Sequence, residues 1–484
     1  MTENNTLQTE RSYGLIRLMA MSIGATLASG VFSLSGDFAA SGAHTLAVLI
    51  GWTIAGIGMF CLCMCFHRLS VIKPELTSGL YAYSRHGFGE FIGFNVAWGY
   101  WLGCILATIS FATLLFAAIG YFMPVFGAGN NLISIICVSA IIWLFVALVL
   151  RGVNQAASLN VIIVSAKIMP ILLLIFAIIF AGKFDMAIFM ENFRGVEGGL
   201  PLMDQIKATT YTTVWVFVGI EAAVVVSGRA KTTVTAGRAT ALSFVCLLAL
   251  YVLISVLSMG VLSTEELAAL GNPPMAGVLE AVVGTWGAVL VNIAVIISLG
   301  GALFTYTLFT ADCAYQPATQ QCFPKLFTRL NKHNAPHVAL IITNAIVQLF
   351  LIIVYFNEST YQICYTLSTS VIMMPYFLSA LYCLKVTCKD PGLKAMSAGG
   401  RLGVWVIVIV GTIYGAWLLY ASGLTYILIS ALLYGPGIFL FAYTRKEQGK
   451  KFFDTRVDAI ACVVLALAFI LSIVLIINGT LQPF

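Results

Sequence analysis

The sequence predicts an all-α polytopic membrane protein, and three observations support this fold class. The chain has 484 residues, of which 60% are hydrophobic and only 9% are charged, and its mean hydropathy is +0.99. A soluble globular domain carries about 25% charged residues. Apolar stretches long enough to cross a bilayer follow one another along the chain, and Lys and Arg gather on one side of them. The net charge of +6 therefore reflects membrane topology and not binding to nucleic acid.

Thirteen apolar stretches are candidates for membrane spans. They cover residues 14–42, 46–66, 91–123, 131–150, 159–181, 207–227, 240–262, 286–314, 338–356, 361–386, 403–421, 424–443 and 457–477. Only short polar loops separate them, so we expect one transmembrane domain over residues 1–484.

The basic residues predict how the chain is oriented. If the N-terminus is cytoplasmic, only Lys183, Arg194 and Lys207 among the 25 Lys and Arg lie on the outer side, and Lys167 lies inside a span. Cytoplasmic loops of membrane proteins carry an excess of basic residues. The first ten residues are polar and lack the basic region and cleavage site of a removable signal peptide. We therefore expect a multi-pass protein with a cytoplasmic N-terminus.

The residue pattern does not favour an enzyme. The sequence has no P-loop, its five His residues lie around loops, and its 12 Cys residues show no paired metal-ligand spacing. We expect no catalytic residues, no cofactor, no metal site and no ATP-driven transport.

Two of the predicted spans are interrupted by residues that weaken a helix. The tract Gly24–Phe32 contains small and hydroxylated residues, and the tract Thr213–Ala223 contains Gly219 and the carboxylate of Glu221. Irregular backbone at membrane depth is tolerated only where it is buried in protein or lines a wet cavity. Two interrupted segments in matching positions of two halves are typical of secondary transporters.

The positions of these tracts predict an internal repeat. Residues 14–181 and 207–386 each contain five predicted spans, and each set opens with an interrupted one. An odd number of spans per repeat places the second copy upside down relative to the first. Residues 403–477 then form two or three additional C-terminal helices.

Five short motifs, taken jointly and in order, resemble one transporter family. They are Ser29-Gly30-Val31-Phe32, Gly79-Leu80-Tyr81-Ala82-Tyr83, Tyr100-Trp101, the tract from Trp215 to Glu221, and Ser298-Leu299-Gly300-Gly301. With them the chain is similar to the amino acid/polyamine/organocation (APC) superfamily, and within it to the basic amino acid/polyamine antiporters. The resemblance covers nearly the whole chain and implies the five-plus-five inverted-repeat (LeuT-like) fold.

The resemblance is strongest to arginine antiporters of the arginine/agmatine and arginine/ornithine kinds. It implies exchange of extracellular L-arginine for intracellular agmatine across the cell inner membrane, which with a decarboxylase consumes internal protons and contributes to acid resistance. Arginine/ornithine exchange is the first alternative, and proton-coupled uptake of an amino acid is the second. A protein that binds without transporting is an alternative from another class. Relatives of this kind work in the lipid bilayer and are often homodimers.

The resemblance also implies how the α-amino and α-carboxyl groups of a substrate are bound. The hydroxyl of Ser29 and the N–H of Gly30 would bind the carboxylate, and carbonyls near Thr26, Trp215 and Val218 would accept from the ammonium. A broken helix presents both kinds of unpaired backbone group without a charged side chain. The alternative is that Ser29 and Gly30 only permit tight helix packing.

A second set of positions would contact the substrate side chain. Tyr306 stands where relatives have a tryptophan that stacks on the guanidinium, and a tyrosine is the weaker cation–π partner. Cys104 and Ser368 match pocket positions, and Thr108 stands where close relatives often have an asparagine. Ala28 stands where relatives often have glycine.

A third set would open and close the site or couple it to ions. Tyr100, Glu221 and Tyr376 match residues that we expect to close the site on the outer side, and Tyr81 matches a position linked to pH response. Lys167 resembles a lysine whose ammonium replaces sodium, so we expect sodium-independent transport. Glu221 and Lys167 are the two intramembrane charges that this interpretation uses. The alternatives are ordinary core packing and, for Lys167, snorkelling to the inner surface.

Overall fold

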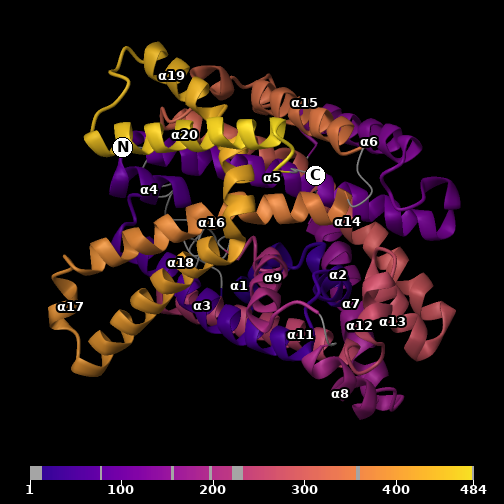
Figure 1. The fold of residues 1–484 in the computed structure, drawn as a ribbon. Coiled ribbons are helices and arrows are strands. Elements are labelled where there is room, and N and C mark those ends of the chain that lie inside the picture. The colour runs from indigo at the N-terminus through magenta and orange to yellow at the C-terminus, as the bar shows by residue number, and fades with distance from the viewer. Residues whose placement is uncertain are drawn as a thin grey trace.

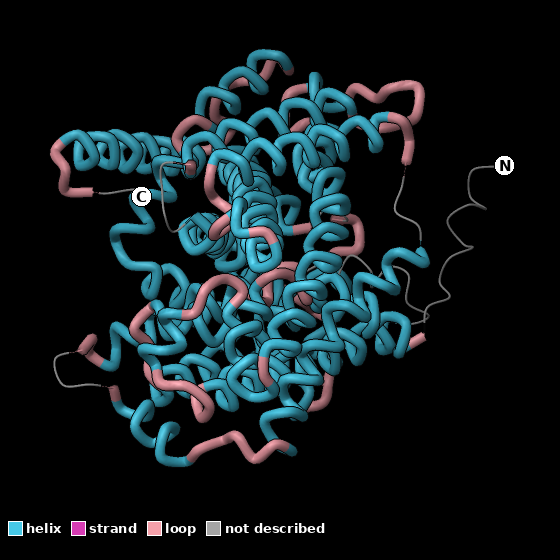
Figure 2. The backbone as a smooth tube through the Cα atoms, turned by 90° about the vertical axis from the view of Figure 1, so that its right-hand side faces the viewer, coloured by secondary structure: helices cyan, strands magenta, loops and turns pink. Residues whose placement is uncertain are grey.

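The computed structural model describes residues 14–76, 79–153, 157–195, 199–220, 233–355 and 360–481. All regular structure in these segments is helical, as Figure 2 shows. The all-α fold class is therefore confirmed.

The helices follow the predicted spans closely. In chain order they are α1 (Leu15–Thr26), α2 (Gly30–Ala40), α3 (Thr45–Ile72), α4 (Leu80–Phe88), α5 (Glu90–Phe122), η1 (Pro124–Phe126), α6 (Leu132–Leu150), α7 (Ala157–Phe180), α8 (Met186–Arg194), α9 (Leu202–Trp215), α11 (Thr233–Ser258), α12 (Thr264–Ala269), α13 (Pro274–Val283), α14 (Thr285–Thr319), η2 (Lys325–Thr328), α15 (His337–Val354), α16 (Thr360–Thr387), α17 (Gly392–Ala395), α18 (Ala398–Tyr434), α19 (Gly437–Glu447) and α20 (Arg456–Ile477).

The first two C-terminal spans meet where the sequence predicts. The spans expected at 403–421 and 424–443 form α18 and α19, and the chain turns inside α18 at Gly423, where φ is 68°. A left-handed φ favours glycine because it has no Cβ. The last expected span, 457–477, coincides with α20, whose 22 residues are long and apolar enough to cross a membrane.

The short helices divide between two ends of the molecule. Figure 1 shows α4 and α17 at the left and α8, α12 and α13 at the right. The first group belongs to loops predicted to lie on one side of the membrane and the second to loops predicted to lie on the other.

The helix α5 forms the centre of the core. Burial within the protein covers 94% of its apolar window, and it packs against α14 and α16. Close approach to α16 depends on Gly103, where a methyl group would lie 2.8 Å from Cγ1 of Ile372. This packing forms one wall of the candidate site.

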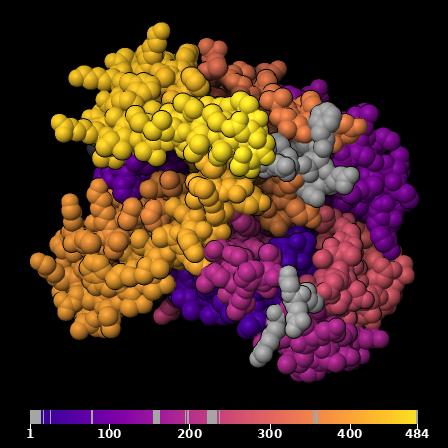
Figure 3. All heavy atoms as spheres, viewed as in Figure 1, coloured from indigo at the N-terminus to yellow at the C-terminus, as the bar shows by residue number. Residues whose placement is uncertain are grey.

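The helix α20 lies at the periphery instead. Only 11% of its apolar window is buried, and Figure 3 shows its residues on the surface of the molecule. It is fixed to the core at one end, where the carboxylate of Asp458 accepts a hydrogen bond from the backbone N–H of Phe91 at 3.0 Å. The thirteenth span is therefore tied to the start of α5.

Candidate functional site

The first interrupted span is broken where the sequence predicts it. Helix α1 ends at Thr26 and α2 begins at Gly30, with Leu27 in an extended conformation between them. The Thr26 hydroxyl donates to the carbonyl of Ser22 at 2.9 Å, so its side chain stabilises the last turn of α1. The prediction of a broken helix in this tract is confirmed.

The second interrupted span also stops at the predicted place. Helix α9 ends at Trp215, and residues 216–220 form turns in which Gly219 has a φ of 101°. The N–H of Val218 donates to the carbonyls of Val214 and Trp215, at 3.0 and 3.2 Å. Glu221, the predicted gate carboxylate, lies outside the described residues.

The two breaks meet at Gly30 and Trp215. A methyl group at Gly30 would lie 2.8 Å from Cγ1 of Val216 and 3.0 Å from the indole nitrogen of Trp215, so only glycine fits between the two segments. The Ser29 hydroxyl and the Trp215 indole N–H are both buried, and neither has a hydrogen-bond partner in the described part of the chain. Unpaired polar groups at this depth are costly, which is typical of a site that a ligand completes.

Aromatic side chains line one side of this junction. The ring of Phe111 on α5 lies 6.0 Å from that of Trp215 and 4.8 Å, edge to face, from that of Tyr306 on α14. The ring of Tyr365 on α16 lies 5.8 Å from that of Trp215. Through Phe111, the structure brings Tyr306 close to the helix breaks.

Two further pocket candidates lie along α5, facing α14. The Thr108 hydroxyl donates to the carbonyl of Cys104 at 2.8 Å and lies 3.5 Å from that of Thr310. The thiol of Cys104 lies 3.7 Å from that of Cys313. Thr108 and Cys104 therefore lie one and two helical turns from Phe111 on the wall between α5 and α14.

Ser368 has a structural partner in this state. Its hydroxyl donates to the carbonyl of Gly103 at 2.8 Å and joins α16 to α5. The side chain is fully buried, so this bond occupies the hydroxyl that the sequence assigned to the substrate.

Two of the expected gate residues, Tyr100 and Tyr376, lie at the same end of the α5–α16 pair. Helices α5 and α16 run antiparallel, with Ser110 bonded to Tyr361 near one end and the ring of Tyr382 beside Gly87 near the other. Tyr100 and Tyr376 lie beyond Cys104 and Ser368 in the direction of the second end. Their role in closing the site stays a prediction. Tyr81 is buried on the short helix α4 at the same end.

Lys167 reaches the first break from α7. Its side chain is buried, and its ammonium donates to the carbonyl of Gly24 at 3.4 Å. This carbonyl belongs to the last turn of α1, where helix carbonyls lack intrahelical partners. The contact does not fit a lysine that snorkels to the membrane surface.

Several residues beside the site were missed by the sequence interpretation. Asp37 and Asp312 both lie inside predicted spans, so Glu221 and Lys167 are not the only intramembrane charges. The same rule that selected Glu221 would have found them. Phe111, Tyr361 and Tyr365 were also missed, although Tyr361 and Tyr365 lie seven and three residues before Ser368 on one face of α16.

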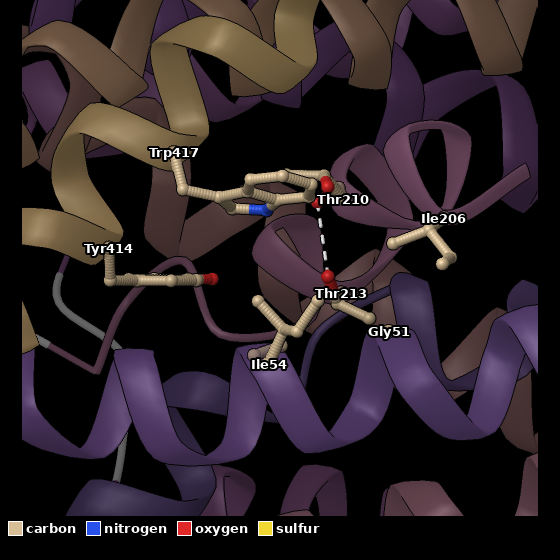
Figure 4. Close-up of a pocket in the computed structure, with 8 residues that line it drawn as sticks. Gly51, Ile54, Ile206, Thr210, Thr213, Tyr414 and Trp417 are labelled. Atoms are coloured by element: carbon tan, nitrogen blue, oxygen red, sulfur yellow. Dashed lines mark hydrogen bonds between the residues drawn. The ribbon is translucent and has the colours of Figure 1, made fainter. Parts of the chain in front are cut away.

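A shallow pocket lies between α3, α9 and α18. Figure 4 shows the Trp417 and Tyr414 rings at one side and Thr213, which donates to the carbonyl of Thr210, at the other. None of the predicted site residues lines this pocket. Among the described residues, no group of three His, Cys, Asp or Glu side chains could hold a metal ion.

Broken helices that meet in a membrane core define the class of secondary transporters. A family model described as amino acid permease matches residues 13–429. The chain belongs to this family, which is part of the APC superfamily, and the family consists of transporters rather than enzymes.

Three relatives extend over nearly the whole chain. The arginine/ornithine antiporter of Pseudomonas aeruginosa is 42% identical over 90% of this chain and 91% of its own length. The L-lysine transport protein of Corynebacterium glutamicum is 36% identical over 98% and 97%. The arginine/agmatine antiporter of Chlamydia abortus is 35% identical over 98% of both chains.

Proposed function

We propose that the protein is a secondary antiporter that brings L-arginine into the cell in exchange for a product of arginine metabolism. The observation that carries this proposal is the junction of the two broken helices, where Ser29, Gly30 and Trp215 meet. The names of the relatives support antiport of a basic amino acid.

The amino acid backbone would bind at the start of α2. The Ser29 hydroxyl, which lacks a partner among the described residues, and the N–H of Gly30 would donate to the substrate carboxylate. The positive end of the α2 dipole favours an anion there. Carbonyls at Thr26, Trp215 and Val218 would accept from the α-ammonium.

The cationic side chain would bind along the aromatic wall. The faces of Tyr306 and Trp215 would contact the guanidinium, with Phe111 holding both rings. Thr108 and Cys104 extend the same wall and would contact the end of a long side chain. Tyr100, Tyr376 and Glu221 would act as the gate that closes the site.

The counter-substrate has two candidates. Agmatine is the one that the resemblance of the sequence implies, with a contribution to acid resistance. Ornithine is favoured by the relative with 42% identity and keeps the α-carboxylate that Ser29 and Gly30 would bind.

The fold would support transport by an alternating-access mechanism. We propose that residues 14–181 and 207–386 are inverted repeats, because a helix break opens each of them, and that 403–477 are additional helices. The protein would lie in the cell inner membrane with a cytoplasmic N-terminus, as a homodimer.

Exchange in proteoliposomes tests the proposal. Radiolabelled arginine is offered to vesicles preloaded with agmatine, ornithine, arginine or buffer. We expect uptake only when a counter-substrate is inside, and the preload that drives it identifies agmatine or ornithine. Equal uptake into empty vesicles would contradict antiport and favour proton-coupled uptake.

A further inference from the structure

A chain of hydrogen bonds leads away from the helix break along one face of α2. The Ser33 hydroxyl donates to Oδ2 of Asp37 at 2.5 Å and lies 2.7 Å from the hydroxyl of Tyr361. Because Ser33 has one hydroxyl proton, Tyr361 donates to Ser33 when Ser33 donates to Asp37. All three side chains are at most 2% exposed.

Tyr361 connects this chain to the site. Its ring lies 5.4 Å from that of Tyr365, which in turn lies 5.8 Å from the ring of Trp215. The Ser33 hydroxyl also lies 3.2 Å from the carbonyl of Gly30 at the break. Ser29, Ser33 and Asp37 are spaced four residues apart, which places them on one face of a helix. A continuous polar track therefore runs from the break to Asp37.

The charge of Asp37 is not matched in this state. Its Oδ1 atom is buried without a hydrogen-bond partner, and it makes no ion pair with any residue that the structure describes. An acidic side chain at membrane depth is costly and generally marks the path of an ion or a substrate. An unpaired carboxylate oxygen is suited to bind a cation that donates hydrogen bonds.

Asp37 lies toward the end of α2 that faces away from the break. Gly36, its neighbour, packs directly against Pro274 of α13, and α12 also contacts α2. In Figure 1, α12 and α13 lie at the end of the molecule that the predicted topology places outside. The polar track is therefore closed from that side in this structure, and it would be exposed when α2 separates from α16.

We propose that Asp37 determines specificity for cationic substrates: its carboxylate binds the guanidinium or ammonium group of a substrate that arrives from outside. This inference rests on the proposed function, because it needs a state in which α2 and α16 are apart. Ser33 and Tyr361 then offer hydroxyl groups along the track to the break. When the site closes, they bond to Asp37 again.

The experiment compares charged and neutral isosteres in the purified, reconstituted protein. Inhibition constants are measured for arginine and for citrulline, which replaces the guanidinium with a neutral ureido group, in wild type, Asp37→Asn and Ser33→Ala. Asp312→Asn is the matched control, because Asp312 is an intramembrane acid on α14 outside the track. Asparagine keeps the shape of the side chain, and citrulline binding reports whether the site is folded.

We expect Asp37→Asn to raise the inhibition constant of arginine at least tenfold. The inhibition constant of citrulline should stay within twofold of wild type. Ser33→Ala should raise the inhibition constant of arginine by less, because the carboxylate of Asp37 remains. An equal rise for both ligands would assign Asp37 a merely structural role, and an unchanged arginine constant would overturn the proposal directly.

Failure of the proposed function has a different signature. If wild type takes lysine and not arginine, arginine exchange is wrong, and the same comparison is made with lysine and its neutral analogue norleucine. If wild type takes only neutral amino acids, the inference about Asp37 is wrong as well.

Discussion

Gly30 lies in direct contact with the indole of Trp215, so that a methyl group added at Gly30 would come within 2.7 Å of Cδ1. The two residues are separated by most of the first predicted repeat and by the outer loop, yet they terminate the two broken helices against each other. Space at this junction is limiting. The size of residue 30 therefore controls how closely the two breaks can approach.

Substitution of Gly30 by alanine should reduce exchange at least about tenfold. Overpacking costs about 1–3 kcal/mol, and Trp215 must move away from the site to relieve it. Arginine exchange and thermal stability are measured together. Gly403→Ala is the control, because no atom lies within 4 Å of a methyl group there. Normal exchange in Gly30→Ala would contradict this, because it would show that the junction can widen without loss of transport.

Tyr306→Ala should weaken arginine binding by more than about tenfold, which corresponds to 1.4 kcal/mol. The substitution removes the aromatic face that lies beside Phe111 and leaves the helix breaks intact. Titration calorimetry measures the affinity, and Tyr306→Phe, which keeps the ring, should lose much less. Equal affinity in wild type and Tyr306→Ala would place Tyr306 outside the pocket.

Transport should persist in sodium-free buffer. The ammonium of Lys167 contacts the carbonyl of Gly24 near the first break, where it supplies a fixed positive charge. Lys167→Met should abolish most exchange in any buffer, whereas Lys183→Met, at an exposed lysine, should not. A strict requirement for sodium in wild type would refute this role of Lys167.

The helices and both breaks could be predicted from the sequence because their causes are local. Apolar runs of sufficient length specify spans, and glycines such as Gly30 and Gly219 mark the two breaks. The boundary between the expected spans 403–421 and 424–443 has a local cause as well, because the chain kinks at Gly423, where φ is 68°.

The partners of the site residues could not be predicted, because they depend on which helix faces meet. The contact between Ser33 and Tyr361 joins residues 328 positions apart. No periodicity in either helix indicates that pairing. The same holds for Tyr100 and Tyr376, which lie at one end of the site because of how α5 and α16 run past each other.

Ser368→Ala provides a test of whether a predicted pocket residue acts on the substrate or on the fold. Its hydroxyl donates to the Gly103 carbonyl, and hydrogen bonds between membrane helices contribute about 0.6 kcal/mol on average. We therefore expect a small loss of thermal stability and an arginine affinity within about threefold of wild type. Thr369→Ala is a suitable control, because Thr369 is equally buried and its hydroxyl donates to the carbonyl of Tyr365 within the same helix. An arginine affinity reduced tenfold in Ser368→Ala alone, with stability unchanged, would show that Ser368 exchanges its helix partner for the substrate during transport.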